Sequence, residues 1–515
     1  MSVRPSGVAP ATRRTVLLTL PALLAVLLGA VGLVRADAGA TTRQVTVGGV
    51  PLTEVRAGPV EGRRPGVVIA HGFAGSARLM RPLADTVARQ GAVALLLDFA
   101  GHGANPARLP GAGRDAAETR AALARDLDVA VAHLRTLPDV DPARIILVGH
   151  SMGAGAVTRY AAGHPDIART VAISLPDGDD LPDGRPEGLL LIVGGAEFPG
   201  FRDTAEATAR RGDPGGRRLV VVPGVEHISV LFAGRTHREV AAWVGGGGAP
   251  PWPVARAVSA GLLLLGAGLG FVPLVGLLLG RRPAPPRPVP PTSVVAAVAV
   301  GAGVGVAALA PTARLPLAVG GYVTGFLLVT GGLLVAAARW WPLPGPAAAL
   351  PGPAAALPGP AAALPGPAAA PVGPRRDVRA VVAGLLLTGY AVGAVAVPIH
   401  LGLTSALPVG ARWWLLPLVA AGCLAFLTGA ELVTGGRSLR YAAVGASAVL
   451  ALTGAAVVGL APGFVLLVVP LFAVLVAWQA AWAAVLRRAG APRWLPALVG
   501  AVLLAWPVAT TLPLS

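Results

Sequence analysis

The sequence has a single cysteine, Cys423, and none of its 42 basic residues is a lysine. One cysteine excludes a disulfide framework within the chain, so each polar region must be stabilised by its own core. Carboxylates are scarce as well, because only two of the 25 acidic residues, Asp377 and Glu431, lie outside residues 35–253. The other 23 are confined to that segment, which composition therefore identifies as the polar part of the protein.

The net charge of +17 raises the question of a nucleic-acid partner, so its location matters. Residues 35–253 carry 24 arginines against 23 acidic residues, a net charge of +1. The other 18 arginines accompany apolar runs, where basic residues at the ends of membrane spans set their orientation. We therefore expect no nucleic-acid partner.

Long apolar runs make up much of the chain, which is 54% hydrophobic with a mean hydropathy of +0.68. Residues 15–34 are twenty uncharged residues, and a helix of that length spans roughly 30 Å, one hydrocarbon core. We predict a signal-anchor at 15–34, with residues 1–14 in the cytoplasm. A twin-arginine export signal around "TRRTVLL" and a cleavage site at "ADA" (36–38) are the competing interpretations, but the run is longer than a usual signal core.

The rest of the chain divides into two domains that differ in their hydrophobicity pattern. In residues 43–245 short apolar strands alternate with charged helical segments, which predicts a mostly parallel sheet with helices on both faces. Residues 257–515 predict an all-α polytopic membrane domain of about eight helices, interrupted by a Pro/Ala-rich cytoplasmic linker at 341–374 in which "LPGPAAA" repeats four times. The predicted spans lie near 257–280, 294–310, 317–338, 380–399, 413–434, 441–461, 464–486 and 495–512.

The loop arginines predict the orientation of these spans. If residues 35–253 lie outside, the inside loops of the membrane domain hold twelve arginines and the short outside loops hold only Arg314 and Arg412. Arginines concentrate in cytoplasmic loops. We therefore predict a multi-pass protein of the cell membrane with the polar domain extracytoplasmic. Glu431 is the one acidic residue within a predicted span, which makes it either a functional site or a packing residue near the cytoplasmic interface.

The stretch "RIILVGHSMGAGAV" (144–157) reads as a strand, a sharp turn and a helix that together present Ser151 as a nucleophile. Glycines at 149 and 153 flank the serine because side chains there would clash in the tight turn. The amide of Met152, the next residue, would face an oxyanion. Upstream, "GVVIAHGFAGS" ends a buried run and leaves Phe73, or Ala74, as the second oxyanion donor.

Together "HGFAGS", "DFAGHG" and "GHSMG" resemble the α/β-hydrolase superfamily over roughly residues 45–245. The resemblance implies a serine hydrolase whose acid and histidine follow the nucleophile in the sequence. Glu197 stands where the family usually has Asp, and His227 falls in the histidine loop. Asp203 is the alternative acid, and the cluster Asp177, Asp179, Asp180 and Asp183 is a more remote one.

These residues predict an extracytoplasmic, esterase/lipase-like enzyme that cleaves carboxylic esters or related acyl compounds through an acyl-enzyme on Ser151. The alternatives are an acyltransferase with a lipid or glycan acceptor, and a non-catalytic sensor or partner module of the membrane bundle. The expected partners are the membrane and an acyl or ester substrate, for which a lipid is one candidate. We expect no metal and no cofactor.

Overall fold

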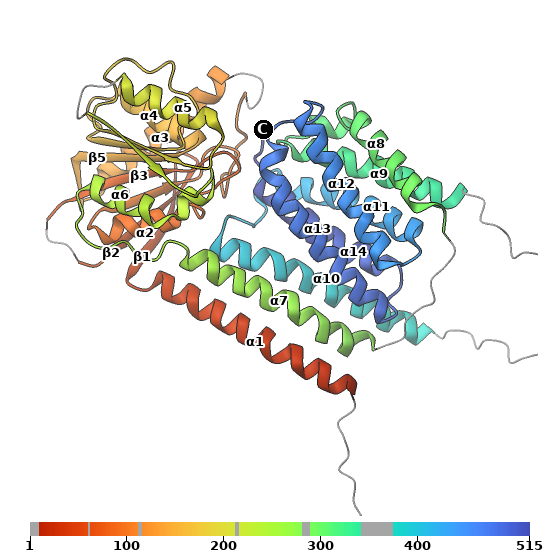
Figure 1. Cartoon of the computed structure of the whole chain (residues 1–515). Helices are drawn as coiled ribbons and strands as arrows, with labels where there is room; N and C mark the ends of the chain where they lie inside the picture. The colour runs from red at the N-terminus through yellow and green to blue at the C-terminus, as the bar shows by residue number, and fades with distance from the viewer. Residues whose placement is uncertain (1–9, 60–61, 112–115, 212–215, 281–288, 341–373) are drawn as a thin grey trace, which may run out of the picture.

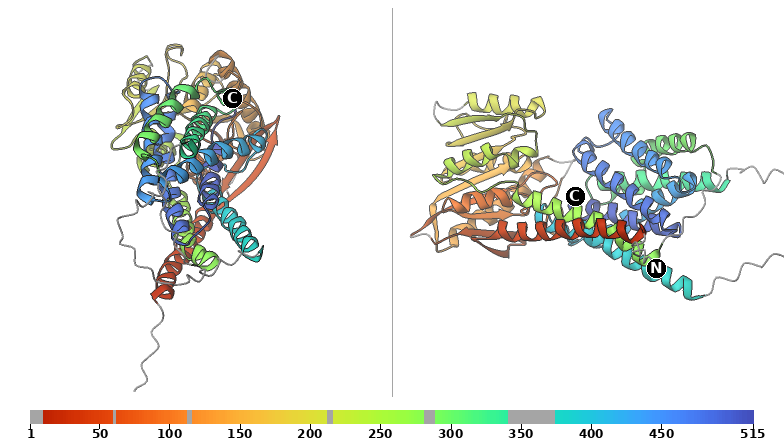
Figure 2. Two further views of the ribbon diagram at one scale, coloured as in Figure 1. Left: turned by 90° about the vertical axis from the view of Figure 1, so that its right-hand side faces the viewer. Right: turned by 60° about the horizontal axis from the view of Figure 1, so that its bottom comes forward.

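The computed structural model describes residues 10–515 except 60–61, 112–115, 212–215, 281–288 and 341–373. The linker predicted at 341–374 therefore lies almost wholly outside the described residues. Figure 1 shows a domain built on a β-sheet at one end of a bundle of long helices. The second view in Figure 2 shows the same arrangement, with the long helices extending away from the sheet domain.

The sheet has eight strands in the order β1-β2-β4-β3-β5-β6-β7-β8. β2 pairs antiparallel with β1 and with β4, and all the other pairs are parallel. The carboxyl ends of the parallel strands therefore meet at one edge of the sheet. The strands are Ala40–Val47, Val50–Ala57, Arg64–Ala70, Val93–Leu97, Val140–His150, Arg169–Ile173, Leu189–Gly194 and Arg217–Val222, numbered β1 to β8 along the chain.

Helices cover both faces of the sheet, because the central strands are apolar on both sides. Along β3, Val68 packs in the cluster that contains Leu127 of α3, whereas Val67 and Ile69 pack with Leu83 of α2 on the other face. Alternate residues of a strand point to opposite faces, so an unbroken apolar run serves two cores. The helices are α2 (Arg81–Arg89), α3 (Ala116–Thr136), α4 (Met152–Gly163), α5 (Pro199–Arg210) and α6 (Gly234–Val244). The predicted α/β class is confirmed.

The remaining helices form the bundle in Figure 1. Eight of them, among the described residues, are long and apolar enough to cross a membrane. α8 has 16 residues, a rise of about 24 Å, and is shorter than the predicted span at 294–310. The helices are α1 (Pro10–Asp37), α7 (Ala255–Leu279), α8 (Thr292–Ala307), α9 (Gly320–Trp340), α10 (Pro374–Gly402), α11 (Arg412–Thr434), α12 (Ser438–Val457), α13 (Val465–Arg488) and α14 (Trp494–Thr511).

Glu431 of α11 is buried in this bundle and forms an ion pair with Arg487 of α13. The guanidinium of Arg487 also lies 4.6 Å from the ring centre of Tyr441 on α12. One contact set thus joins three helices. These contacts give Glu431 a role in helix packing. Packing is one of the two roles that the sequence left open for this residue.

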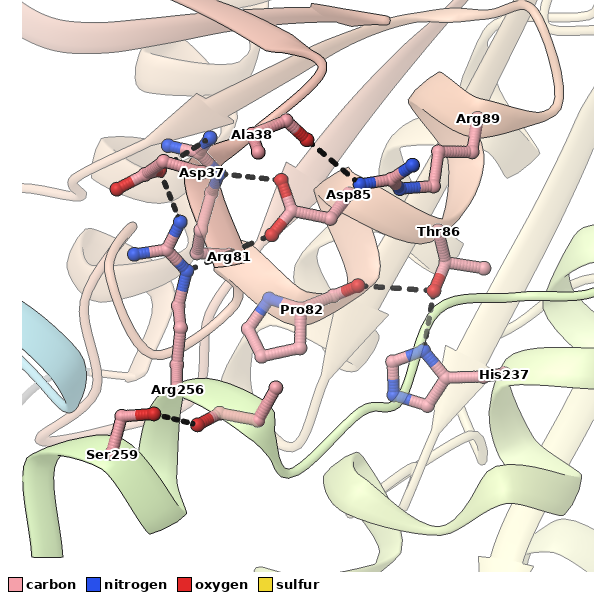
Figure 3. Close-up of polar contacts among 11 residues, drawn as sticks. Asp37, Ala38, Arg81, Pro82, Asp85, Thr86, Arg89, His237, Arg256 and Ser259 are labelled. Atoms are coloured by element: carbon pink, nitrogen blue, oxygen red, sulfur yellow. Dashed lines mark hydrogen bonds and ion pairs between the residues drawn. The ribbon is translucent and has the colours of Figure 1, made fainter. Parts of the chain in front are cut away.

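A cluster of alternating charges joins the sheet domain to the helices that flank it in the sequence (Figure 3). Arg81 of α2 donates to Asp85 (Nε to Oδ1, 2.7 Å) and to Asp37 at the end of α1 (Nη2 to Oδ1, 3.2 Å). Arg256, in the first turn of α7 and buried, also binds Asp37, and its Nε lies 3.6 Å from Asp85 Oδ2. This cluster ties α2 to the adjacent ends of α1 and α7.

His237 of α6 lies near this cluster, next to Thr86 of α2 (Figure 3), and is fully buried. Its Nδ1 lies 2.6 Å from the Thr86 hydroxyl, and its Nε2 lies 2.8 Å from the carbonyl oxygen of Leu231. Burial lowers the pKa of His237 to about 4, and burial likewise lowers the pKa of His150 to about 3. Both histidines are therefore neutral in the folded domain at neutral pH.

These histidines predict that acid destabilises the protein. In an unfolded chain a histidine has a pKa of about 6.5. As the pH falls below that value the unfolded chain binds protons that the folded domain does not, so the free energy of unfolding falls by about 1.4 kcal/mol per pH unit for each such histidine. This loss continues until the pH reaches the folded-state pKa. We expect Tm of the full chain in detergent micelles to fall steadily between pH 6.5 and 5.

His237→Gln tests whether His237 contributes to this loss of stability in acid. The glutamine amide can still donate to the Leu231 carbonyl, but it does not titrate. The variant should lose stability less steeply than the native protein between pH 6.5 and 5. Equal slopes for the two proteins would show that His237 does not carry this dependence.

Candidate active site

Ser151 stands on the sharp turn between β5 and α4, at the carboxyl edge of the sheet. Its backbone has φ 52° and ψ −118°, a conformation that a non-glycine residue rarely adopts, and its N–H donates to the Ile173 carbonyl (2.9 Å). A methyl group on Gly153 would lie 2.6 Å from the carbonyl oxygens of Ala70 and His71. The glycine is therefore needed for α4 to pack closely against the end of β3, as the sequence motif predicts.

His227 lies in the turn after β8, next to Ser151. Its Nε2 is 3.1 Å from the Ser151 hydroxyl oxygen, within hydrogen-bond distance. Only 6% of the His227 surface is exposed, and the ring of Phe201 from α5 lies 4.6 Å from the imidazole, centre to centre. The imidazole is thus positioned to take the proton of the serine hydroxyl.

Glu197 follows β7 and approaches the other side of the same imidazole. Its Oε2 lies 3.7 Å from His227 Nδ1, which is longer than a hydrogen bond, and both atoms are buried without a hydrogen-bond partner among the described residues. The second carboxylate oxygen, Oε1, accepts from the Ser174 hydroxyl and from the Gly194 amide (3.3 Å). A closure of less than 1 Å would pair the two orphaned atoms.

The alternative acids are not part of this arrangement. Asp203 is exposed on α5, and no contact of its carboxylate with His227 occurs within the described part of the chain. Asp177 and Asp180 both bind Arg159 of α4, at 2.8 and 2.7 Å. Of the candidates considered, Glu197 is the carboxylate that the structure brings to the histidine.

The two predicted oxyanion donors flank the serine. Met152 is the first residue of α4, so its amide has no acceptor in its own helix, and the positive end of the helix dipole lies there. Phe73 lies in the turn after β3, where Ala74 takes φ 58° and the Gly75 amide donates to the Gly72 carbonyl (3.0 Å). Phe73 and Met152 also both line the cavity that contains Ser151.

Two buried histidines brace these loops. His150 Nε2 lies 2.9 Å from the carbonyl oxygen of His227, so its N–H holds the histidine loop against the elbow. His71 Nε2 accepts from the Phe99 amide (3.1 Å), and its Nδ1 lies 2.8 Å from the Gly72 carbonyl oxygen. Burial lowers the pKa of His71 below its usual value, so it stays neutral and the tautomer with the proton on Nδ1 satisfies both contacts.

Asp98, at the end of β4, braces its own loop. Its carboxylate accepts from the amides of Ala77 (2.7 Å) and Ala104 (2.9 Å). It thereby joins the segment after β3 to the "DFAGHG" turn. This is a structural role and involves neither Ser151 nor His227.

Sequence reasoning missed Ser174 and Phe201. Ser174 follows β6, has φ 55°, and its hydroxyl holds the Glu197 carboxylate. Phe201 reaches His227 from α5. Neither residue lies in a recognisable motif, because their contacts depend on how β6, β7 and α5 are placed by the sheet.

The cavity at Ser151 has a volume of about 1330 Å³ and is mostly apolar. It extends from Ser151 and His227 between α3 and α4. The turn between α12 and α13 contributes Gly463 and Phe464 to its wall, and the first turn of α13 contributes Leu466, so the helical domain completes the pocket. Among the described residues there is no cluster of three or more His, Cys, Asp or Glu side chains that could hold a metal ion.

A second contact joins the helical domain to the loop after β4. Arg412, the first residue of α11, is fully buried, and its Nη2 donates to the carbonyls of Gly101 (2.8 Å) and Leu512 (3.2 Å). The Leu514 amide donates to the same Gly101 carbonyl (2.8 Å), and the Leu514 carbonyl accepts from the Leu109 amide (2.9 Å). The loop after β4, which lies beside the cavity, is thus hydrogen-bonded to the helical domain as well as within the sheet domain.

Comparison with known proteins identifies related families. Residues 62–177 match the family described as "Serine aminopeptidase, S33". Two uncharacterised proteins of Mycobacterium tuberculosis, from strains H37Rv and CDC 1551, are each 31% identical over 195 residues. This match covers 32% of the chain and spans 64% of the length of each relative.

Solved structures of hydrolases are also similar. A protein from Thermoplasma acidophilum described as a "predicted CIB-like hydrolase" is 17% identical with a TM-score of 0.33, and the match covers 40% of this chain and 96% of that one. A dienelactone hydrolase from Anabaena variabilis is 21% identical with a TM-score of 0.32, over 40% of this chain and 97% of that one. The strand order, the elbow at Ser151 and the family match together show that the sheet domain has the α/β-hydrolase fold.

Proposed function

We propose that the α/β-hydrolase domain of this chain is a serine hydrolase for carboxylic esters. The observation that carries the proposal is the 3.1 Å contact between Ser151 Oγ and His227 Nε2, on an elbow whose backbone exposes the serine to a large apolar cavity. A serine so placed has a base within reach and room for an acyl group.

In the proposed reaction the Ser151 oxygen attacks the ester carbonyl while His227 Nε2 takes the hydroxyl proton. The amides of Met152 and Phe73 stabilise the negative oxygen of the tetrahedral intermediate. His227 then returns the proton to the leaving alcohol, which leaves an acyl-enzyme. Water, activated by the same imidazole, releases the carboxylic acid and regenerates Ser151.

Glu197 is proposed to orient His227 and to stabilise the imidazolium that forms during both steps. The carboxylate is itself held by Ser174 and the Gly194 amide, so only one of its oxygens is free for the histidine. Glutamate is one methylene longer than the usual aspartate. The contact that Ser174 makes keeps the longer side chain directed back towards the imidazole.

The proposed location is the outer face of the cell membrane. The support is the distribution of loop arginines, twelve against two, which favours an orientation with the sheet domain on the side opposite the arginine-rich loops. The candidate spans α1 and α7 precede and follow the hydrolase domain in the sequence, and the ion pair between Asp37 and Arg256 joins their adjacent ends, as expected for two membrane helices that reach one side of the bilayer.

A membrane-impermeant fluorophosphonate probe tests the nucleophile and the location together. Intact cells that express the native protein should be labelled, and cells that express Ser151→Ala should not. Labelling that persists in the variant would contradict Ser151 as the nucleophile. Labelling that appears only after lysis would contradict the extracytoplasmic location.

A further inference from the structure

A second cavity, of about 930 Å³, adjoins the one that contains Ser151. Four residues line both cavities, namely Phe73, Leu109, Gly111 and Phe464. The rings of Phe73 and Phe464 lie 4.4 Å apart, centre to centre. This aromatic pair, one ring from each domain, therefore forms the boundary between the two cavities.

The walls of the second cavity come mainly from the helical domain. They include the segment from Ala313 to Val319, around η2 (Pro311–Arg314), and the turn from Gly459 to Pro462. These segments connect α8 to α9 and α12 to α13 at the ends of the helices that face the sheet domain (Figure 1). With these helices spanning a bilayer, as their length and composition allow, the cavity would lie at the level of the lipid headgroups.

The two cavities differ in chemistry. The first is lined mainly by apolar side chains, among them Phe198, Phe201 and Met152, and its charged lining is balanced, with two arginines (Arg120, Arg159) and two carboxylates (Asp128, Asp177). The second is lined by two arginines, Arg108 and Arg314, both exposed. Within the described part of the chain neither guanidinium takes part in an ion pair.

Arg314 is also unusual in its position. It is one of only two arginines in the predicted outside loops of the membrane domain, where the positive-inside rule disfavours them. The other, Arg412, is explained by its buried contacts with the Gly101 and Leu512 carbonyls. Arg314 makes no such contact with any described residue and lines the cavity instead.

We propose that the two cavities form one site for a phosphate-bearing membrane lipid ester. The acyl chain enters the first cavity, the ester carbonyl reaches Ser151 beside the Phe73–Phe464 pair, and Arg108 and Arg314 bind the phosphate. Arginine suits this role because its planar array of donors matches phosphate oxygens. The inference rests on the proposed hydrolase function, which supplies the chemistry at Ser151.

Hydrolysis by the full chain in detergent micelles tests the substrate class. Two esters with the same acyl chains are compared, neutral dioctanoylglycerol and anionic dioctanoylphosphatidylglycerol. The native protein should prefer the anionic ester at least tenfold in kcat/KM. Arg314→Gln and Arg108→Gln should each lower this preference about five- to tenfold, whereas Arg43→Gln, an exposed arginine on β1, should leave it unchanged. Hydrolysis without a charge preference, or a preference that survives both changes, would overturn the inference.

A binding measurement separates this inference from the proposed function. Ser151→Ala protein should bind a fluorescent short-chain phosphatidylglycerol, and the added Arg314→Gln change should weaken that binding about tenfold. If this holds while native protein hydrolyses neither ester, the phosphate site stands and the hydrolase proposal fails. If both esters are hydrolysed and Arg314→Gln leaves lipid binding intact, the hydrolase proposal stands and the phosphate site fails. Displacement of the lipid by glycerol phosphate at equal concentration would assign the site to a soluble phosphate and overturn the lipid assignment.

Discussion

Replacing Ser151 by alanine is expected to lower kcat for ester hydrolysis by about 10⁶-fold, and replacing His227 by alanine by a similar factor. Ser151 and His227 act as one unit, because the hydroxyl is a weak nucleophile until the imidazole at 3.1 Å takes its proton. Removing either group therefore removes the same chemical step. The double variant should be no slower than either single variant.

The measurement is steady-state hydrolysis of a soluble p-nitrophenyl ester by the full chain in detergent micelles. A residual rate of about 10³- to 10⁴-fold over the uncatalysed reaction should remain in all three variants, because the amides of Met152 and Phe73 are unchanged. Arg43→Gln serves as the control for purification and detergent effects, since Arg43 is exposed on β1. Single losses that multiply in the double variant would mean that the two residues act independently, and would contradict the proposed mechanism.

Local sequence was sufficient to predict the elbow. Ser151 is flanked by Gly149 and Gly153 within five residues, and the strained turn there depends on close backbone approaches that only glycine allows. The fold class also followed from local patterns, because buried strands alternating with amphipathic helices have few ways to pack. These features required no knowledge of which distant segments meet.

Contacts between distant segments could not be predicted in this way. Phe464 lies more than 300 positions after Ser151 in the sequence, in a turn that reads only as a loop between two spans, yet it lines the same cavity. Arg412 reads as a residue of an outside loop but is fully buried against Gly101. Both placements follow from how the helical domain docks on the sheet domain, and no local pattern encodes that docking.

The choice of acid was open in the sequence for the same reason. Glu197 and Asp203 lie six residues apart on the segment after β7, and both precede His227 as the resemblance requires. Their environments separate them, because Glu197 is buried beside Ser174 whereas Asp203 points outward from α5. The register of β6 against β7 brings Ser174 to the carboxylate, and that register is a tertiary property.

Glu197→Gln is therefore expected to lower kcat by about 10³- to 10⁴-fold, the size of effect seen when a triad loses its carboxylate. The amide keeps the shape and the Ser174 contact. It cannot, however, stabilise an imidazolium at His227, and its NH₂ group offers Nδ1 a donor where an acceptor is needed. Asp203→Asn, the matched change on the exposed alternative, should alter kcat less than twofold.

The Glu197→Gln prediction has a second readout. Glu197 Oε2 lies 3.7 Å from His227 Nδ1, so the carboxylate faces the histidine and not the substrate. Because the carboxylate acts through the histidine, Glu197→Gln should reduce kcat with little change in KM, and fluorophosphonate labelling of Ser151 should slow in proportion. Ser174→Ala, which frees the carboxylate from its anchor, should slow both reactions by a smaller factor, about tenfold. A larger loss in Asp203→Asn than in Glu197→Gln would reassign the acid to α5, and equal small losses would leave His227 working without a carboxylate.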